Sequence, residues 1–170
     1  ITTTYSDWTT LANAITDASD TTSEFVLKGD ITATSTITVS REITLKAPVG
    51  TTITRGLDNS GTAFTGAFFD NQSTLTLEGI TLDGGSTIEA TAPLITSSGS
   101  LTLNNCTLQN NNNSNATGTG IYLQINDTSS LCSFNDVSFG KNSSDAHIKI
   151  KNDITWNIAL FNCNPKKLLP

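Results

Sequence analysis

The chain has 170 residues, which suits a single domain of ordinary size. Only 14% of the residues are charged and the net charge is −6, so the clustered lysines and arginines of a nucleic-acid-binding surface are missing. No apolar stretch reaches the roughly 18 residues of a membrane-spanning helix, which argues against direct insertion into a bilayer. Roughly thirty threonines, with many serines and asparagines, favour β-strands joined by tight turns.

The first predicted element is a helix at about residues 6–18, with the sequence SDWTTLANAITDA. Ser6 or Asp7 is a suitable N-cap, because a short polar side chain there accepts hydrogen bonds from the first free amides. Apolar residues at helical spacing give this helix one buried face. They are Trp8, Leu11, Ala12 and Ile15.

Short strands with apolar residues on one face are predicted from about residue 22 onward. The first strands contain Phe25, Leu27 and Ile31, and the next layer contains Ile53. The segment ITVSREITL at residues 37–45 fits as an early copy of a repeat that is clearer farther along the chain.

The repeat is clearest where residues 74–85 (TLTLEGITLDGG) align without a gap with residues 100–111 (SLTLNNCTLQNN), 26 positions later. Further copies lie at residues 132–142 (CSFNDVSFGKN) and 158–164 (IALFNCN). A third strand in each copy is predicted from further inward-facing pairs. These are Phe68 and Phe69, Leu94 and Ile95, Ile121 and Leu123, and Ile148 and Ile150.

The aligned copies form four apolar columns that alternate with threonine, serine or asparagine. The columns are Leu75, Leu101, Cys132 and Ile158; Leu77, Leu103, Phe134 and Leu160; Ile80, Cys106, Val137 and Cys163; and Leu82, Leu108 and Phe139. Because one copy cannot bury its apolar face alone, successive copies must stack.

The predicted fold class is therefore all-β, a single-stranded right-handed parallel β-helix of the pectin-lyase-like kind. Its strands span about residues 22–164, and residues 165–170 form a tail. The N-terminal helix is expected to cap the open apolar end of the stack. Residues 1–170 are predicted to be one domain.

Each copy has a polar two-residue turn between its second and third columns, and asparagine there tolerates left-handed backbone. The turns are Glu78-Gly79, Asn104-Asn105, Asn135-Asp136 and Phe161-Asn162, and we expect Asn105 to be packed in its corner. Cys106 and Cys163 face inward two strands apart, about 10 Å, which is beyond disulfide reach. Three free, buried thiols are expected. The sequence NNNNSNATGTG at residues 110–120 predicts a projecting loop.

Residues 72–164 resemble the β-helical repeats of bacterial and archaeal surface adhesins, including the chlamydial polymorphic outer-membrane proteins. Two segments carry a phenylalanine three residues before an asparagine, Phe139-Gly140-Lys141-Asn142 and Phe161-Asn162-Cys163-Asn164, and Gly118-Thr119-Gly120-Ile121 is similar to the small-residue turn of that family. The segments FVLKGDI and ITLKAPVGTTITRG look like the opening of such domains. The resemblance implies an extracellular or cell-surface location for a monomer, or for one part of a longer surface protein.

An enzyme of the same fold, a polysaccharide lyase or glycoside hydrolase, is the main alternative. Such enzymes need paired carboxylates, or a carboxylate cluster for Ca²⁺ with a basic residue. The outward positions of the repeat are mostly threonine and serine, with Ala159 and Asn164 in the last copy, and carry no carboxylate or arginine. Asp70-Asn71 and Asp83-Gly84 are interpreted as turns, and His147 has no nucleophile pattern beside it. We therefore assign no catalytic, cofactor-binding or metal-binding residue.

The function we predict is non-catalytic binding of an extended glycan or another surface ligand through rows of hydroxyl groups, with loop 110–120 available for specificity. Tyr122 is the aromatic candidate for contact with a sugar. The candidate hydroxyl side chains are Thr76, Thr102, Ser133, Thr81, Thr107 and Ser138. Ice binding is a minor alternative, since it requires adjacent outward threonine pairs and the repeat offers a single threonine position in each strand.

Overall fold

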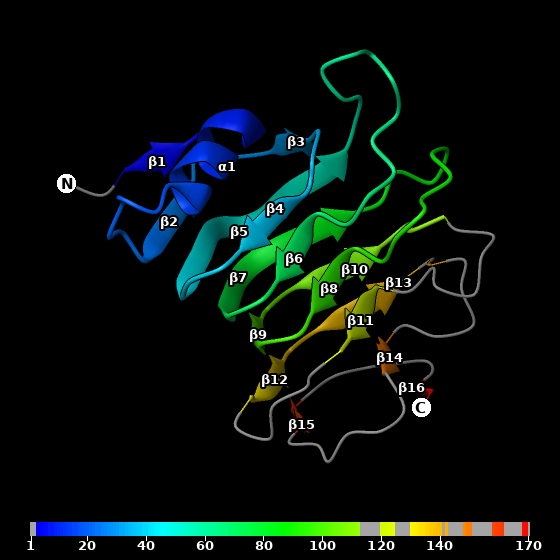
Figure 1. Cartoon of the computed structure of the whole chain (residues 1–170). Helices are drawn as coiled ribbons and strands as arrows, with labels where there is room; N and C mark the ends of the chain where they lie inside the picture. Colours follow the sequence, from blue (N-terminus) through cyan, green and yellow to red (C-terminus); the bar gives the residue numbers. More distant parts are fainter. Residues whose placement is uncertain are drawn as a thin grey trace.

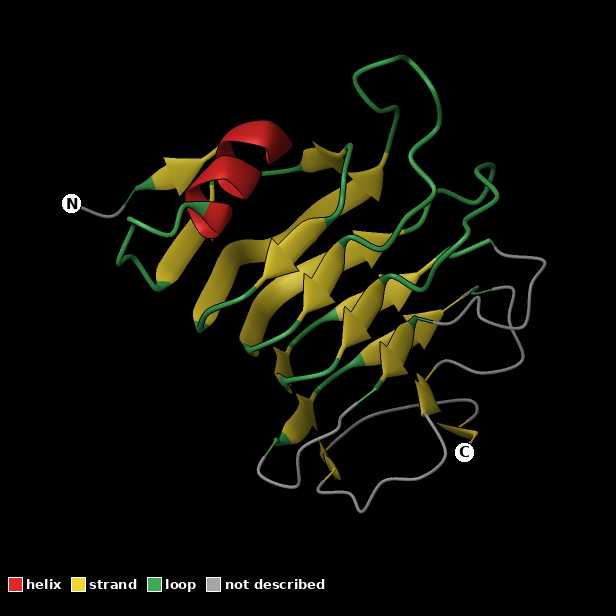
Figure 2. Ribbon diagram, viewed as in Figure 1, coloured by secondary structure: helices red, strands yellow, loops and turns green. Residues whose placement is uncertain are grey.

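The computed structural model describes residues 3–112, 120–124, 130–140, 142, 148–150, 158–161 and 168–169, and these are mostly β-strand with a single helix (Figures 1 and 2). The helix is α1 (Trp8–Thr16). The strands are β1 (Thr4–Tyr5), β2 (Glu24–Leu27), β3 (Ile31–Ala33), β4 (Ile37–Val39), β5 (Ile43–Arg55), β6 (Phe69–Asn71), β7 (Thr74–Asp83), β8 (Ile95–Ser97), β9 (Ser100–Asn104), β10 (Thr107–Gln109), β11 (Ile121–Leu123), β12 (Cys132–Asn135), β13 (Ser138–Gly140), β14 (Ile148–Ile150), β15 (Ile158–Phe161) and β16 (Leu168–Leu169).

The described strands form two sheets, and the chain passes back and forth between them. The larger sheet follows the order β1-β2-β5-β7-β9-β12-β15, with β3, β10 and β13 joined beside it, and the smaller sheet follows the order β16-β14-β11-β8-β6-β4. Each pairing between these strands is parallel. Consecutive strands of the smaller sheet are therefore separated in sequence by strands of the larger one.

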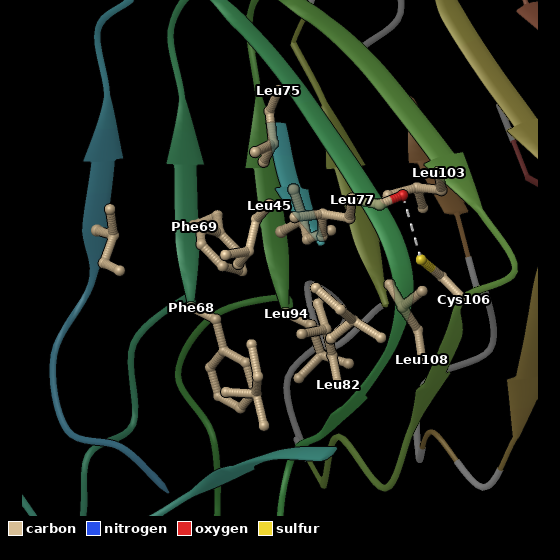
Figure 3. Packing of buried hydrophobic residues seen from close by; sticks show 14 of the residues in the cluster. Leu45, Phe68, Phe69, Leu75, Leu77, Leu82, Leu94, Leu103, Cys106 and Leu108 are labelled. Atoms are coloured by element: carbon tan, nitrogen blue, oxygen red, sulfur yellow. Dashed lines mark hydrogen bonds between the residues drawn. The ribbon is translucent and has the colours of Figure 1, made fainter. Parts of the chain in front are cut away.

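The apolar columns predicted from the repeat pair in register in the larger sheet. Leu75 lies opposite Leu101, which lies opposite Cys132, and Leu82, Leu108 and Phe139 form another column of the same kind. The inward residues of the smaller sheet, such as Phe69 and Ile95, join the same buried cluster, so the core lies between the sheets (Figure 3). Buried apolar columns at period two are the reason that both sheets form along this sequence.

The earliest copy of the repeat was aligned wrongly. Residues 37–45 were expected to match residues 74–85, but Ile43 and Leu45 pair with Leu75 and Leu77, and Ile53 pairs with Leu82. The register shifts between Lys46 and Thr51, where β5 holds extra residues. The true copy is therefore β5 itself. The segment 37–39 forms β4 in the smaller sheet, because a short apolar alternation fits either sheet equally well.

A left-handed residue marks the corner between the second and third columns. Asn105 and Asp136 both have φ of 51°, and Gly79 has φ of 75°. The expectation of left-handed asparagine holds for Asn105, but its side chain is exposed rather than packed. Strand β7 also runs through Gly79 without a break, where a turn was predicted. A Cβ atom at Gly79 would lie 2.8 Å from the Ala47 carbonyl oxygen, so glycine is required there by space as well as by conformation.

Helix α1 begins at Trp8, and the N-cap is Asp7, whose Oδ1 accepts a hydrogen bond of 2.8 Å from the Thr10 amide. Hydrogen bonds from Thr10 hold the pKa of Asp7 below its ordinary value. Trp8, Leu11 and Ile15 of the predicted apolar face are buried, and Ala12 is half-buried. Trp8 donates its indole N–H to the Ser35 carbonyl oxygen at 2.9 Å and packs against Phe69. The helix thus lies over the core beside β4, the outermost strand of the smaller sheet (Figure 1).

Arg41 binds the C-terminal end of α1 through hydrogen bonds. Its guanidinium donates to the carbonyl oxygens of Ala14 and Ile15, at 3.2 and 3.3 Å, and to that of Thr22. A cation at a helix C-terminus also interacts favourably with the helix dipole. No helix in the described part of the chain is long and apolar enough to cross a membrane.

Two of the three cysteines, Cys106 and Cys132, lie in the described part of the chain and are buried and free, as expected. Burial raises the pKa of each thiol to about 11. Cys106 Sγ lies 3.5 Å from the Leu77 carbonyl oxygen (Figure 3). Cys163 lies outside the described residues, as do His147 and most of the predicted loop at residues 110–120. Of the predicted tail at 165–170, Leu168–Leu169 form strand β16 and the other four residues lie outside the described part of the chain.

Candidate functional site

Three of the candidate hydroxyl residues form one row across the larger sheet. Thr76 of β7 lies opposite Thr102 of β9, and Thr102 lies opposite Ser133 of β12. Thr44 of β5 extends the row on the other side of Thr76. Each of these side chains is half-buried and lies between two fully buried neighbours along its strand, so the Thr76 row (Thr44, Thr76, Thr102, Ser133) faces away from the core.

The other three hydroxyl residues form a second row in the same sheet. The Thr81 row consists of Thr52, Thr81, Thr107 and Ser138, paired in register on β5, β7, β10 and β13. The left-handed corner at Gly79, Asn105 and Asp136 separates it from the Thr76 row. Because a left-handed residue changes the direction of an extended chain, the two rows lie on either side of a bend in the sheet.

Paired outward threonines are present, contrary to the expectation of single positions. Thr74 and Thr76 lie on the same face of β7, and they pair with Ser100 and Thr102 of β9. The arrangement does not continue in either direction. On the β5 side, the position opposite Thr74 is Glu42, which lies just before the strand. On the β12 side, the position opposite Ser100 is Leu131, whose side chain is 49% exposed. A patch two strands wide is too small for an extended ordered-water template, so the pairs do not favour ice binding.

Tyr122 lies apart from both hydroxyl rows. It belongs to β11 in the smaller sheet, where its neighbour in register is Thr96 of β8, and Thr96 in turn pairs with Asp70 of β6. Thr38 of β4 completes this Tyr122 row (Thr38, Asp70, Thr96, Tyr122). The backbone register continues it to Lys149 of β14. The seven candidate residues are therefore divided between two sheets.

Asp70 was interpreted as part of a turn, and the structure corrects this. Asp70 and Asn71 both lie within β6, Asp70 half-exposed and Asn71 fully buried. A signal for this existed in the sequence: Asp70, Thr96 and Tyr122 are separated by 26 positions each, the same offset as the main repeat. The interpretation of Asp83-Gly84 fares better, because Asp83 ends β7 and its Oδ1 accepts a hydrogen bond of 2.9 Å from the Gly85 amide.

A second polar row flanks the Tyr122 row on the smaller sheet. The backbone amide of Ser98 bonds to the Asn71 carbonyl oxygen at 2.8 Å, and that of Gln124 bonds to the Ser97 carbonyl oxygen at 2.6 Å, which continues the parallel pairing by one residue. The resulting Gln72 row consists of Gln72, Ser98 and Gln124. Gln72 Nε2 donates to Asp70 Oδ2 at 2.8 Å, so the two rows are in contact.

Two polar side chains beneath these rows fix the strands from inside. Asn71 and Ser97 are both fully buried, and Asn71 Nδ2 donates to Ser97 Oγ and to the Ser100 carbonyl oxygen, each at 2.8 Å. Ser97 Oγ donates in turn to the Gly99 carbonyl oxygen at 3.0 Å. Satisfied buried polar groups of this kind favour one arrangement of the strands over alternatives. Asn71 is also too deeply buried to accept a glycan at its Asn-x-Ser sequence.

A buried arginine holds the loops at the edge where strands of the smaller sheet begin. Arg55, the last residue of β5, is 3% exposed, and its pKa is lowered by burial to about 10, which leaves it charged at neutral pH. An exposed ion pair joins Lys46 to Glu24 at 2.8 Å, whereas the charge of Arg55 is surrounded by oxygen dipoles. Those oxygens belong to the Phe64, Gly66 and Gly84 carbonyls and the Asn111 side chain.

These contacts join three successive connections into one layer. Asn111 Nδ2 donates to the Ala92 carbonyl oxygen at 3.1 Å, and the Thr91 amide and hydroxyl both donate to the Thr65 carbonyl oxygen, at 2.8 and 3.2 Å. Thr65 and Thr91 each lie four residues before the first residue of β6 and β8. The described residues of the connections that lead into β6, β8 and β11 are thereby joined on one side of the sheets (Figure 2).

The described acidic side chains do not form a metal centre: no group of three or more histidine, cysteine, aspartate or glutamate residues lies close enough to hold an ion. Asp83 is surrounded by donors, since its Oδ2 accepts from Gln109 at 2.9 Å and from Asn110 at 2.8 Å. Asp70 is the carboxylate that faces outward among the described residues of the Tyr122 and Gln72 rows. The described residues of these two rows can therefore supply hydrogen bonds, one aromatic ring and one carboxylate.

Comparisons with protein-family models, with curated proteins and with solved structures found no match to this chain.

Proposed function

We propose that this chain is a right-handed parallel β-helix in which each stretch of about 26 residues contributes strands to both sheets. The alternation of the chain between two parallel sheets supports this architecture, as does the in-register pairing of residues such as Leu75 and Leu101. Parallel strands joined through a crossover are almost always right-handed, because of the twist of the strands. Helix α1 then covers the first turn of the stack and protects its open edge.

We further propose that the β-helix is a non-catalytic module of a secreted or cell-surface protein, of the adhesin type, which binds an extended polysaccharide. The observation that carries the proposal is the set of in-register rows of hydroxyl, amide and carboxylate side chains on the outer faces. A linear polymer laid along the stack meets an outward side chain of the row at every strand, about 4.8 Å apart. A rigid row presents these groups with little entropy left to lose on binding.

A polysaccharide lyase or hydrolase of the same architecture is the alternative that the rows argue against. Hydrolysis needs two carboxyl groups on either side of the scissile bond, at roughly 5–10 Å. In the described residues of the four outward rows, Asp70 has no second carboxylate on a neighbouring strand, since Thr38 and Thr96 flank it. Binding without cleavage is the function that this chemistry supports.

The test is a glycan array probed with the whole chain, followed by incubation of any bound polysaccharide with the protein and measurement of new reducing ends and of unsaturated products. Retention on one or a few polysaccharide classes without release of fragments is expected. Sustained turnover that a single carboxylate substitution abolishes would overturn the non-catalytic assignment. An absence of binding to every glycan, with the protein folded by circular dichroism, would overturn the binding assignment.

A further inference from the structure

We infer that the ligand contacts the smaller sheet, on the Tyr122 and Gln72 rows, and that it is a neutral, hydroxyl-rich polysaccharide crossing β6, β8 and β11. This inference rests on the proposed binding function and specifies its site and ligand class. In this arrangement the Thr76 and Thr81 rows of the larger sheet do not contact the ligand. The six contact residues are Asp70, Gln72, Thr96, Ser98, Tyr122 and Gln124.

The composition of this face is the first reason. Tyr122 is half-buried on the outer side of β11, and an aromatic ring with a polar tip is the kind of side chain that covers the C–H face of a sugar. Asp70 is a charged acceptor, and hydrogen bonds from sugar hydroxyls to a carboxylate are about twice as strong as those between neutral groups. Thr96 lies between them in the same row. The Thr76 row carries only single hydroxyls, which water satisfies equally well.

The geometry of the two rows is the second reason. Asp70 and Tyr122 are two strands apart, about 10 Å, so one sugar ring cannot contact both and an oligomer can. Gln72 is bonded to Asp70 at 2.8 Å, which holds the carboxylate in place from its own strand. The buried Asn71–Ser97 hydrogen bond lies on the inner side of the same strands and keeps their register. The contact groups are therefore preorganised along the direction of the stack.

The negative charge of this surface, and the fixed connections at its edge, favour a neutral polysaccharide as the ligand. Asp70 is the charged residue among the six contact residues and the chain has a net charge of −6, so a polyanion such as a polyuronate is repelled. The connections tied by Arg55 and Asn111 run along the edge at which these strands begin, so that edge is fixed before the ligand arrives. Neutral hydroxyls satisfy the acceptor and the amides without introducing a buried unpaired charge.

The inference is tested by affinity gel electrophoresis of the whole chain in gels containing a soluble β-glucan, a mannan, a xylan or polygalacturonate. Tyr122→Ala and Asp70→Asn are each expected to weaken the interaction with a retarding neutral polysaccharide by about tenfold. Thr96→Val and Thr102→Val form the matched pair, because each threonine is half-buried between two buried residues of its strand and pairs with a row member on both sides. Thr96→Val is expected to weaken binding severalfold, and Thr102→Val is expected to leave it unchanged.

The outcomes separate this inference from the function on which it rests. Binding weakened by Thr102→Val and Thr76→Val but not by Tyr122→Ala would overturn the site and leave the binding function standing. Tighter retention by polygalacturonate than by the neutral polymers would overturn the ligand class. Failure of the unaltered chain to bind any polysaccharide would overturn the proposed function itself. Circular dichroism and thermal midpoints of every variant confirm that lost binding is not lost folding.

Discussion

Asn105 lies where the backbone of the larger sheet must take a left-handed conformation, with φ of 51°. Asparagine tolerates that region because its short polar side chain can bond locally, whereas a β-branched residue meets its own backbone. The exposed side chain means that little packing is lost when it is replaced. Substitutions of Asn105 therefore test the backbone preference of the residue separately from its side-chain contacts.

Asn105→Val is expected to lower the free energy of unfolding by about 1–2 kcal/mol, since valine is strained at positive φ. Asn105→Gly is expected to leave it nearly unchanged, because glycine adopts this conformation without strain. Urea denaturation followed by circular dichroism measures both. Equal destabilisation by the two substitutions would show that the asparagine side chain, rather than the backbone conformation, is what the corner requires.

The two described cysteines make the stability of the fold depend on pH. Burial raises the pKa of Cys106 and Cys132 from 9.0 to about 11, so the folded chain retains protons that the unfolded chain releases. Their contribution to the free energy of unfolding is complete below about pH 9 and is lost as the pH rises toward 11. We expect the unaltered protein to lose stability between about pH 9 and 11 more steeply than a Cys106→Val, Cys132→Val variant. Parallel denaturation curves across that range would contradict this.

At the scale of elements, Arg55 connects parts of the chain that no local pattern joins. It leaves the end of β5 and bonds to the connections after β5, β7 and β10. Its guanidinium also lies over the rings of Phe64 and Phe68, with the central carbon 5.4 and 4.9 Å from the ring centroids. The loops are thus held by a single side chain with several donors, a role for which arginine geometry is suited and lysine geometry is not.

Arg55→Met is expected to lower the free energy of unfolding by about 3 kcal/mol, because it leaves several buried carbonyl oxygens without donors. Arg55→Lys is expected to recover only part of this loss. Lys46→Met is the control, since its ion pair with Glu24 is exposed and contributes at most about 1 kcal/mol. A change for Arg55→Met as small as that for Lys46→Met would indicate that the loops are held by other contacts.

At the scale of the whole molecule, the paired strands are far apart along the chain. Leu45 pairs with Leu77, and Leu75 pairs with Leu101, 32 and 26 positions later. Few contacts can form before such long segments close, and parallel pairing offers no hairpin as a starting point. Folding is thus governed by topology more than by the stability of any one strand.

Refolding of the intact chain from urea is expected to take milliseconds to seconds or longer, as is typical of folds dominated by nonlocal pairing. Stopped-flow circular dichroism at a strand wavelength measures this directly. A Leu103→Ala variant, which removes a fully buried side chain from the second column, is expected to destabilise the protein by about 2–5 kcal/mol. Complete refolding within microseconds would contradict a core assembled from distant copies.

Much of the larger sheet was predictable because the alternation of apolar and polar residues along one strand indicates which of them face inward. Leu77, Leu103 and Phe134 recur beside polar neighbours, and period-two burial places them inward whatever the surroundings. The copy at β5 was missed because extra residues between Lys46 and Thr51 shift the register. Asp70 was missed because a single acid before an asparagine also fits a turn, and only the offset of 26 to Thr96 and Tyr122 distinguishes the two.

The sequence by itself determined the strand character, the inward columns and the apolar helix, since each depends on the alternation or spacing of neighbouring residues. Only the tertiary structure decided that Tyr122 lies on a different sheet from Thr76, that Asn105 is exposed and that Arg55 is buried among three loops. Those facts depend on which segments meet after the chain has changed direction at its corners. A periodic pattern carries no information about that direction, because it records the two faces of a strand and not where the strand is placed.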